Sequence, residues 1–142
     1  MKRTTQKGFF LVEVVVAASI IAVVLMLLLG AIQNSVEASQ RSLERTQASY
    51  LLEEGAEAIR SIRDSSWTNI STLAAGTTYY LSWGGSSWTL GTTPNTIDSF
   101  TRTVVVSAVS RDTNQDIAST GGTDDPNTKK VTVTVTWQSQ SG

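Results

Sequence analysis

The run Gly8-Phe9-Phe10-Leu11-Val12-Glu13, followed by an uncharged segment at residues 14–32, decides how this chain is organised. As an α-helix, residues 14–32 span about 28 Å at about 1.5 Å per residue, which is close to the thickness of bilayer hydrocarbon. A carboxylate placed in lipid or in a helix bundle costs at least about 2.5–3.5 kcal/mol. Glu13 therefore needs a positively charged partner, and the apolar segment itself supplies none.

The nearest positive charges lie in front of the segment, within a short leader at residues 1–8. They are Lys2, Arg3 and Lys7. Basic residues stay on the cytoplasmic side of a membrane, so this leader predicts export of the C-terminal part of the chain. If the chain is cut after Gly8, the new amino terminus at Phe9 is a positive charge that a second copy could bring to Glu13. The sequence therefore predicts self-assembly.

Composition excludes several functions. The chain has 142 residues, room for one small domain besides the apolar segment, and its formal net charge of −1 gives no support for nucleic-acid binding. It contains no Cys, so neither a disulfide nor a Cys-ligated zinc can form. It also contains no His, the commonest general base and metal ligand. We therefore expect a protein that is not an enzyme.

Residues 8–13 resemble the cleavage and methylation motif of type IV prepilins and type II secretion pseudopilins, whose usual form is Gly-Phe-Thr-Leu-Ile-Glu. Phe10 stands at a variable position where threonine is common. The resemblance implies that prepilin peptidase cuts after Gly8 and methylates the new N-terminal Phe9. It also implies that Glu13 pairs with the amino group of a neighbour, while the apolar helix leaves the bilayer to form the core of a filament.

The resemblance also implies partners and a location. The implied partners of the chain are prepilin peptidase, other pilin or pseudopilin subunits in a homo- or heteropolymer, an inner-membrane assembly platform and, before assembly, membrane lipid. The chain would cross the inner membrane once, leader inside, and then enter an extracellular or periplasmic filament. Residues 51–60 resemble a stretch of minor pilins and pseudopilins, so we favour these over a major pilin. Motility, adhesion, secretion and DNA uptake all stay open as the role of the filament.

We expect an α+β fold, in which a long N-terminal α-helix, membrane-spanning in its first half, packs against a small antiparallel β-sheet, as in pilins. The predicted segments are the leader at 1–8, a transmembrane or filament-core helix at 9–32, an amphipathic helix at 33–64 and a β-rich domain at 65–142. Helical spacing predicts one apolar stripe on the amphipathic helix, formed by Val36, Leu43, Tyr50, Leu51, Leu52, Ile59 and Ile62. Gly30 is a point where the helix can bend, and Gly55 suggests close packing.

The β-rich domain is predicted from runs of Val, Thr and aromatic residues. Residues 79–83 and 87–90 flank Gly84-Gly85 and predict a hairpin. A strand is expected at 100–109. At 131–137 valine and threonine alternate, which indicates a strand with one buried face, and we expect Asp124 to Asn127 to form a turn before it.

A polar loop offers a candidate calcium site. Asp112, Asn114 and Asp116 alternate as oxygen ligands do in calcium loops, and some pseudopilins bind calcium in this region. Ile117 occupies the place of the usual glycine, however, and Thr123 that of the closing acid. An ordinary solvated loop is the favoured interpretation, with no cofactor.

A second class of function also fits the sequence. Trp83 and Trp88 flank the Gly-Gly turn, and such a pair either packs across the hairpin, which we favour, or stacks on sugar rings. The alternative is therefore a non-polymerising, single-pass membrane protein whose β-domain binds a surface ligand such as carbohydrate. Cleavage after Gly8 separates the two classes.

Overall fold

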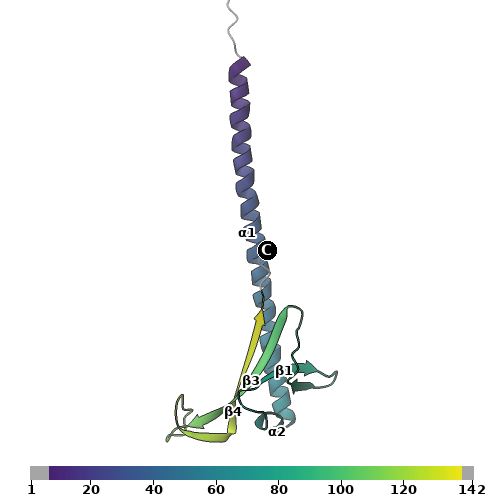
Figure 1. Cartoon of the computed structure of the whole chain (residues 1–142), viewed down its shortest axis with the longest axis vertical. Coiled ribbons are helices and arrows are strands. Elements are labelled where there is room, and N and C mark those ends of the chain that lie inside the picture. Colours follow the sequence, from purple (N-terminus) through teal and green to yellow (C-terminus); the bar gives the residue numbers. More distant parts are fainter. Residues whose placement is uncertain (1–6, 139–142) are drawn as a thin grey trace, which may run out of the picture. The chain divides into compact units, whose positions relative to one another are not determined.

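The structure, a computed structural model, describes residues 7–138, with the backbone alone at residues 7–9. Residues 1–6 of the predicted leader lie outside the described residues. The elements in chain order are α1 (Lys7–Ser65), α2 (Thr68–Ser71), β1 (Thr78–Trp83), β2 (Trp88–Gly91), β3 (Phe100–Arg111) and β4 (Thr123–Trp137) (Figure 1). One long helix with a small antiparallel sheet confirms the predicted α+β class.

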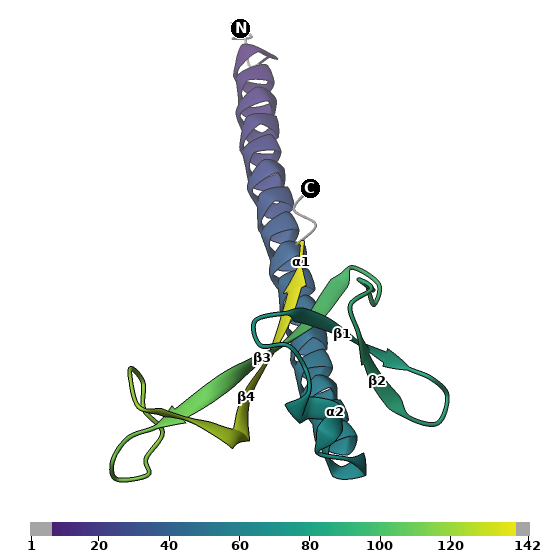
Figure 2. The ribbon, with the colours of Figure 1, turned by 60° about the horizontal axis from the view of Figure 1, so that its bottom comes forward.

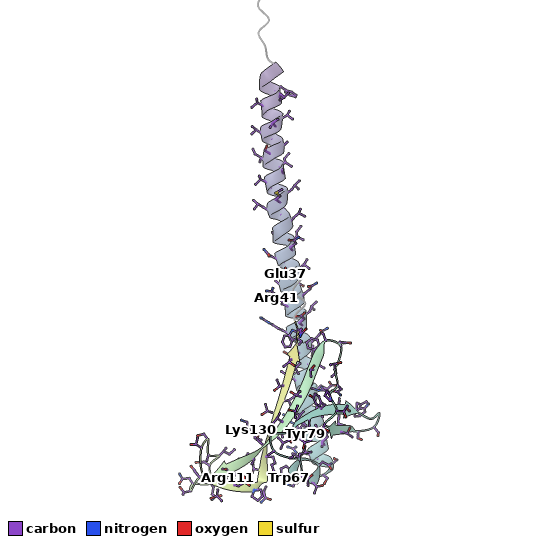
Figure 3. All side chains as sticks on the ribbon, viewed as in Figure 1. Glu37, Arg41, Trp67, Tyr79, Arg111 and Lys130 are labelled. Atoms are coloured by element: carbon purple, nitrogen blue, oxygen red, sulfur yellow. The ribbon has the colours of Figure 1, made fainter. Side chains whose placement is uncertain are left out.

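The chain divides into two compact units, which separate between Leu43 and Glu44 of α1. The first unit is helical throughout its described part, and the helix runs without interruption through Gly30. Its apolar side chains project into solvent on all sides (Figure 3). By length and composition this helix can cross a membrane, where a helix satisfies its own backbone hydrogen bonds. It is therefore compatible with a membrane anchor.

The second unit contains a four-stranded antiparallel sheet in the order β2-β1-β3-β4. The predicted hairpin is confirmed, with Trp83 directly opposite Trp88. Its turn needs a glycine at position 85, where φ is +87°. The two strands predicted at 100–109 and 131–137 are also confirmed, and both extend further than predicted.

The start of β4 differs from the prediction. Asp124 to Asn127 were expected to form a turn, but they lie within β4, which pairs with the end of β3 at Ser110 and Arg111. The ladder shifts its register between Ala108 and Ser110 to admit them. Pro126 is tolerated because residues 125–128 fall within this shift and have no partner in β3, so its missing N–H removes no hydrogen bond of the ladder.

The core of the second unit lies between the C-terminal half of α1 and the sheet. Its buried members are Ala58, Ile59, Ile62, Ile70, Tyr79, Leu81 and Val104. The predicted apolar stripe is right at Ile59 and Ile62, but Leu43 and Tyr50 are 62% and 67% exposed. Ala48 and Gly55 are buried instead. Small side chains face the sheet here because they let the helix come close to it.

Gly55 marks the closest approach, as the sequence suggested. A Cβ atom at this position would lie 2.9 Å from Val133 Cγ1 and 3.0 Å from Arg102 Cδ. The first distance is shorter than real Cβ atoms show, and the second is tighter than most of their contacts, so a side chain here would have to displace its neighbours.

Arg102 fills the space that Gly55 leaves. Its side chain is only 2% exposed, and its Nη1 atom donates to Glu54 Oε2 at 2.6 Å and to the Leu51 carbonyl at 3.2 Å. The guanidinium also lies over the ring of Trp88, 5.3 Å from its centroid. Glu54 is about half exposed, so the pair joins a buried cation to an anion at the surface.

We predict that Gly55→Ala destabilises the second unit. The overlap should cost about 1–3 kcal/mol, more than the gain of about 1 kcal/mol in helix propensity. Urea denaturation of the detergent-solubilised full chain measures the change. Gly91→Ala is the matched control, because a Cβ atom there meets nothing within 4 Å. Equal stability of the two variants would contradict the close contact.

The two halves of the ion pair should differ in their effect on stability. Glu54→Met leaves a buried guanidinium without its anion, which should cost about 3 kcal/mol. Arg102→Met leaves a half-exposed carboxylate that water can solvate, so the loss should be less than half as large. The double variant should recover most of the stability, because a buried pair can often be replaced by apolar groups. Urea unfolding tests the order, and equal losses in the two single variants would refute it.

Candidate functional site

The predicted assembly residues lie near the start of α1. Gly8 and Phe9 belong to its first turns, and Glu13 follows one helical turn after Phe9. Glu13 is exposed and shares a shallow surface with Val12 and Val16. Among the side chains described at residues 10–138, none hydrogen-bonds or ion-pairs with Glu13. Its predicted role therefore depends on a group from outside this set of side chains.

The predicted calcium residues form a compact turn. Asp112 Oδ1 accepts hydrogen bonds from the backbone N–H groups of Asn114, at 2.8 Å, and of Asp116, at 3.0 Å. The Asp112 N–H in turn donates to the Asp116 carbonyl at 2.9 Å. Within residues 7–138, no three His, Cys, Asp or Glu side chains gather in a way that could hold a metal ion. Calcium binding stays a prediction.

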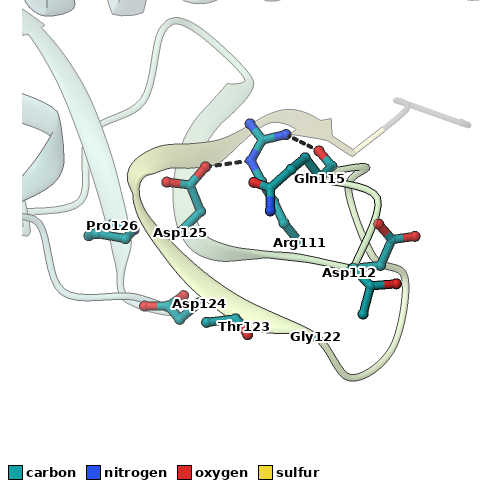
Figure 4. Close-up of a pocket in the computed structure, with 9 residues that line it drawn as sticks. Arg111, Asp112, Gln115, Gly122, Thr123, Asp124, Asp125 and Pro126 are labelled. Atoms are coloured by element: carbon teal, nitrogen blue, oxygen red, sulfur yellow. Dashed lines mark hydrogen bonds and ion pairs between the residues drawn. The ribbon is translucent and has the colours of Figure 1, made fainter.

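Beside this turn, Arg111 links the end of β3 to the start of β4 (Figure 4). Its Nε atom donates to Asp125 Oδ2 at 2.7 Å, and its Nη1 atom donates to the Gln115 carbonyl at 2.7 Å. Thr128 Oγ1 also donates to Asp125 Oδ2, at 2.7 Å, and the Asn127 N–H donates to Oδ1. The hydrogen bonds from Thr128, Arg111 and Asn127, in that order, lower the pKa of Asp125 to about 2.

This cluster was missed at the level of sequence. Arg111 and Asp125 meet only because β4 begins at Thr123, and the predicted turn at 124–127 concealed that pairing. The alternation of valine and threonine begins only at Val131, so it did not indicate that the strand starts earlier. The cluster holds the hairpin together and leaves an open hollow of about 610 Å³ beside it.

Trp83 and Trp88 form the contact that the sequence favoured. The Trp83 and Trp88 rings lie 5.3 Å apart at 58°, so they pack across the hairpin. Trp83 keeps 55% of its surface exposed, and sugar binding there stays a prediction. Trp137 packs against Phe100 and donates from Nε1 to Glu44 Oε2 at 3.1 Å.

Comparison with known proteins adds no relative. No protein-family model matches this chain, and neither a curated protein nor a solved structure is significantly similar to it. We therefore base its function on the residues and contacts described above.

The Asp125 cluster should respond to acid. Because the pKa falls from 3.8 to about 2 on folding, the cluster stabilises the hairpin fully above pH 4 and loses this effect as the pH falls towards 2. Carboxyl-carbon NMR titration of the full chain in detergent should give a pKa of about 2 for Asp125. Thr128→Val should raise the pKa towards 3.8, whereas Thr134→Val, on the same strand, should not. A wild-type value near 3.8 would contradict the hydrogen bonds.

Proposed function

We propose that this chain is a structural subunit, a minor pilin or pseudopilin, of a type IV pilus or of a secretion or DNA-uptake pseudopilus. In this proposal prepilin peptidase removes residues 1–8 and methylates Phe9, and the subunit then assembles through its N-terminal helix. One observation carries the proposal: Glu13 is the single acid on an otherwise apolar helical segment, four residues after Phe9 of a Gly-Phe peptide bond.

The physical argument concerns how such a helix finds partners. Helices in lipid gain little from hydrophobic burial against one another, so close packing and polar contacts select the neighbour. The segment offers both, with small residues at Ala17, Ala18 and Ser19 and a carboxylate at Glu13. An amine–carboxylate pair in a medium of low dielectric constant is stable only in good geometry. We therefore assign Glu13 the role of setting the register between adjacent subunits.

The exposed apolar surface supports the same proposal. The large side chains between Phe10 and Ile32 are more than about two-fifths exposed in the single chain, so lipid or other helices must cover them. On assembly, the helices of neighbouring subunits would replace lipid around these side chains. The β-rich part, which carries the Arg111 cluster and the Trp hairpin, would then be displayed on the filament.

A second candidate is favoured by one observation, the exposure of Trp83 beside Trp88. Under this alternative the chain keeps its leader, stays in the membrane as a monomer and binds a surface ligand such as carbohydrate through the hairpin. It assigns no role to Glu13, which is why we rank it second.

Processing and assembly can be tested in one experiment. In cells with prepilin peptidase and the assembly machinery, mass spectrometry should find a mature chain that starts at N-methylated Phe9. Glu13→Ala should be processed normally, yet its incorporation into sheared filaments should fall by a factor of about ten or more, because the neighbour's amine is left buried without an anion.

Glu37→Ala is the matched control. Glu37 is an exposed acid on the same helix, and its ion pair within residues 10–138 is with the exposed Arg41, so its loss should leave incorporation unchanged. An intact Lys7-Gly8-Phe9 sequence in the mature chain would favour the membrane-anchored alternative. Undiminished incorporation of Glu13→Ala would remove the basis of the polymer.

A further inference from the structure

A small groove lies where the end of α1 meets α2 and β4. Its floor is apolar and includes Ile59, Ile70 and Val131, with Trp67 at its side. Three basic residues also line it, namely Arg60, Arg63 and Lys129. Its volume of about 260 Å³ is below the roughly 300–1,000 Å³ of typical small-molecule pockets. We call it the basic groove.

The basic groove is a local exception to the charge of its unit. Residues 44–138 carry more acidic than basic side chains, yet no acid lines the groove. Arg60 and Arg63 pair with Glu57 and Asp64 through side chains that are all more than half exposed. Such exposed pairs contribute little, so both guanidinium groups can exchange these partners for another acid.

The turn between β3 and β4 carries the complementary surface. Asp112 and Asp116 are exposed there, and the apolar side chain of Ile117 beside them is 67% exposed. We call residues 112–117 the acidic turn. It is held by the hydrogen bonds of Asp112 and by the bond from Arg111 to the Gln115 carbonyl. Because it is already ordered, docking it costs little conformational entropy.

Among the side chains described at residues 10–138, none hydrogen-bonds or ion-pairs with the Asp116 carboxylate, and the Asp112 carboxylate binds only backbone N–H groups of the turn itself. The β3–β4 hairpin extends away from α1 and α2 (Figure 2), and the exposure of Ile117 shows that it packs on little else. One molecule therefore presents an acidic turn with an apolar tip and, elsewhere, a basic groove with an apolar floor.

We infer that the acidic turn of one copy docks in the basic groove of a second copy. Ile117 covers the apolar floor, while Asp112 and Asp116 face the Arg60, Arg63 and Lys129 side chains. Each copy carries both surfaces, so a copy in a filament can receive the acidic turn of one neighbour and offer its own to the next. The inference deepens the proposed function and rests on it, because it makes another copy of this chain the neighbour in the filament.

Cysteine cross-linking tests the contact directly, because the natural chain has no cysteine. Two full-length forms with different tags, Ile117→Cys and Ala56→Cys, are expressed together, and the membranes and filaments are oxidised. Ala56 lines the groove, so a disulfide should join the two tags. Adding Arg60→Glu and Arg63→Glu to the groove form should lower the yield about tenfold.

A charge exchange and a control complete the design. Asp116→Arg in the turn form should restore at least about a third of the yield with the reversed groove, because its side chain takes no part in the hydrogen bonds that hold the turn. Arg45→Glu reverses an exposed charge on α1 that does not line the groove, and it should leave the yield unchanged.

The outcomes separate this inference from the proposed function. Filaments without the mixed cross-link, or with only links between identical tags, overturn the docking and leave the polymer intact. The mixed cross-link in cells that form no filaments supports the docking and overturns the polymer. Loss of incorporation by the reversed groove without any mixed cross-link points to another acidic subunit and also overturns the inference.

Discussion

The second unit depends on how closely α1 approaches the sheet at Gly55. At this position the backbone of the helix lies against Val133 and the aliphatic part of Arg102, with no room for a Cβ atom. That contact selects the face of α1 that is buried, and it accompanies the placement of the Arg102 guanidinium over the Trp88 ring. The Arg102 Nε atom is buried without a hydrogen-bond partner among the described residues, so the arrangement carries a cost. A buried charge here serves to define one packing of helix on sheet, at some expense in stability.

Much of the fold follows from local patterns, and the exceptions have physical causes. The Gly84-Gly85 hairpin and the alternation at 131–137 were predictable, because turn chemistry and a period of two act over a few residues. The buried face of α1 was only half predictable. Large apolar residues such as Tyr50 dominate a hydrophobic pattern read from sequence. The packing at Gly55 depends instead on the lack of a Cβ atom, which such a pattern does not register. The Arg111–Asp125 cluster needed the register of a strand whose beginning is polar.

The candidate sites divide in the same way. Gly8, Phe9 and Glu13 were identified from sequence because the motif is contiguous, and the structure adds that they lie at the start of one continuous helix. The basic groove was invisible to that approach, since it joins Arg63 near the end of α1 to Lys129 of β4. Long-range proximity of this kind depends on the complete fold. The proposed polymer would use both sites. The N-terminal helices would form its core, and the basic groove would form a second contact between neighbouring copies.

The position of β4 has a consequence for how the single chain behaves. Its outer margin pairs with no strand among residues 7–138, and from Val131 to Trp137 that margin has neither a charged side chain nor a proline. Lys129, Lys130 and Pro126 protect only the earlier part. The single chain therefore exposes a row of unpaired backbone N–H and C=O groups along this margin, to which a strand of another chain could add. Such strand addition is the first step towards amyloid-like aggregation, so a partner that covered this margin would also protect the chain from it.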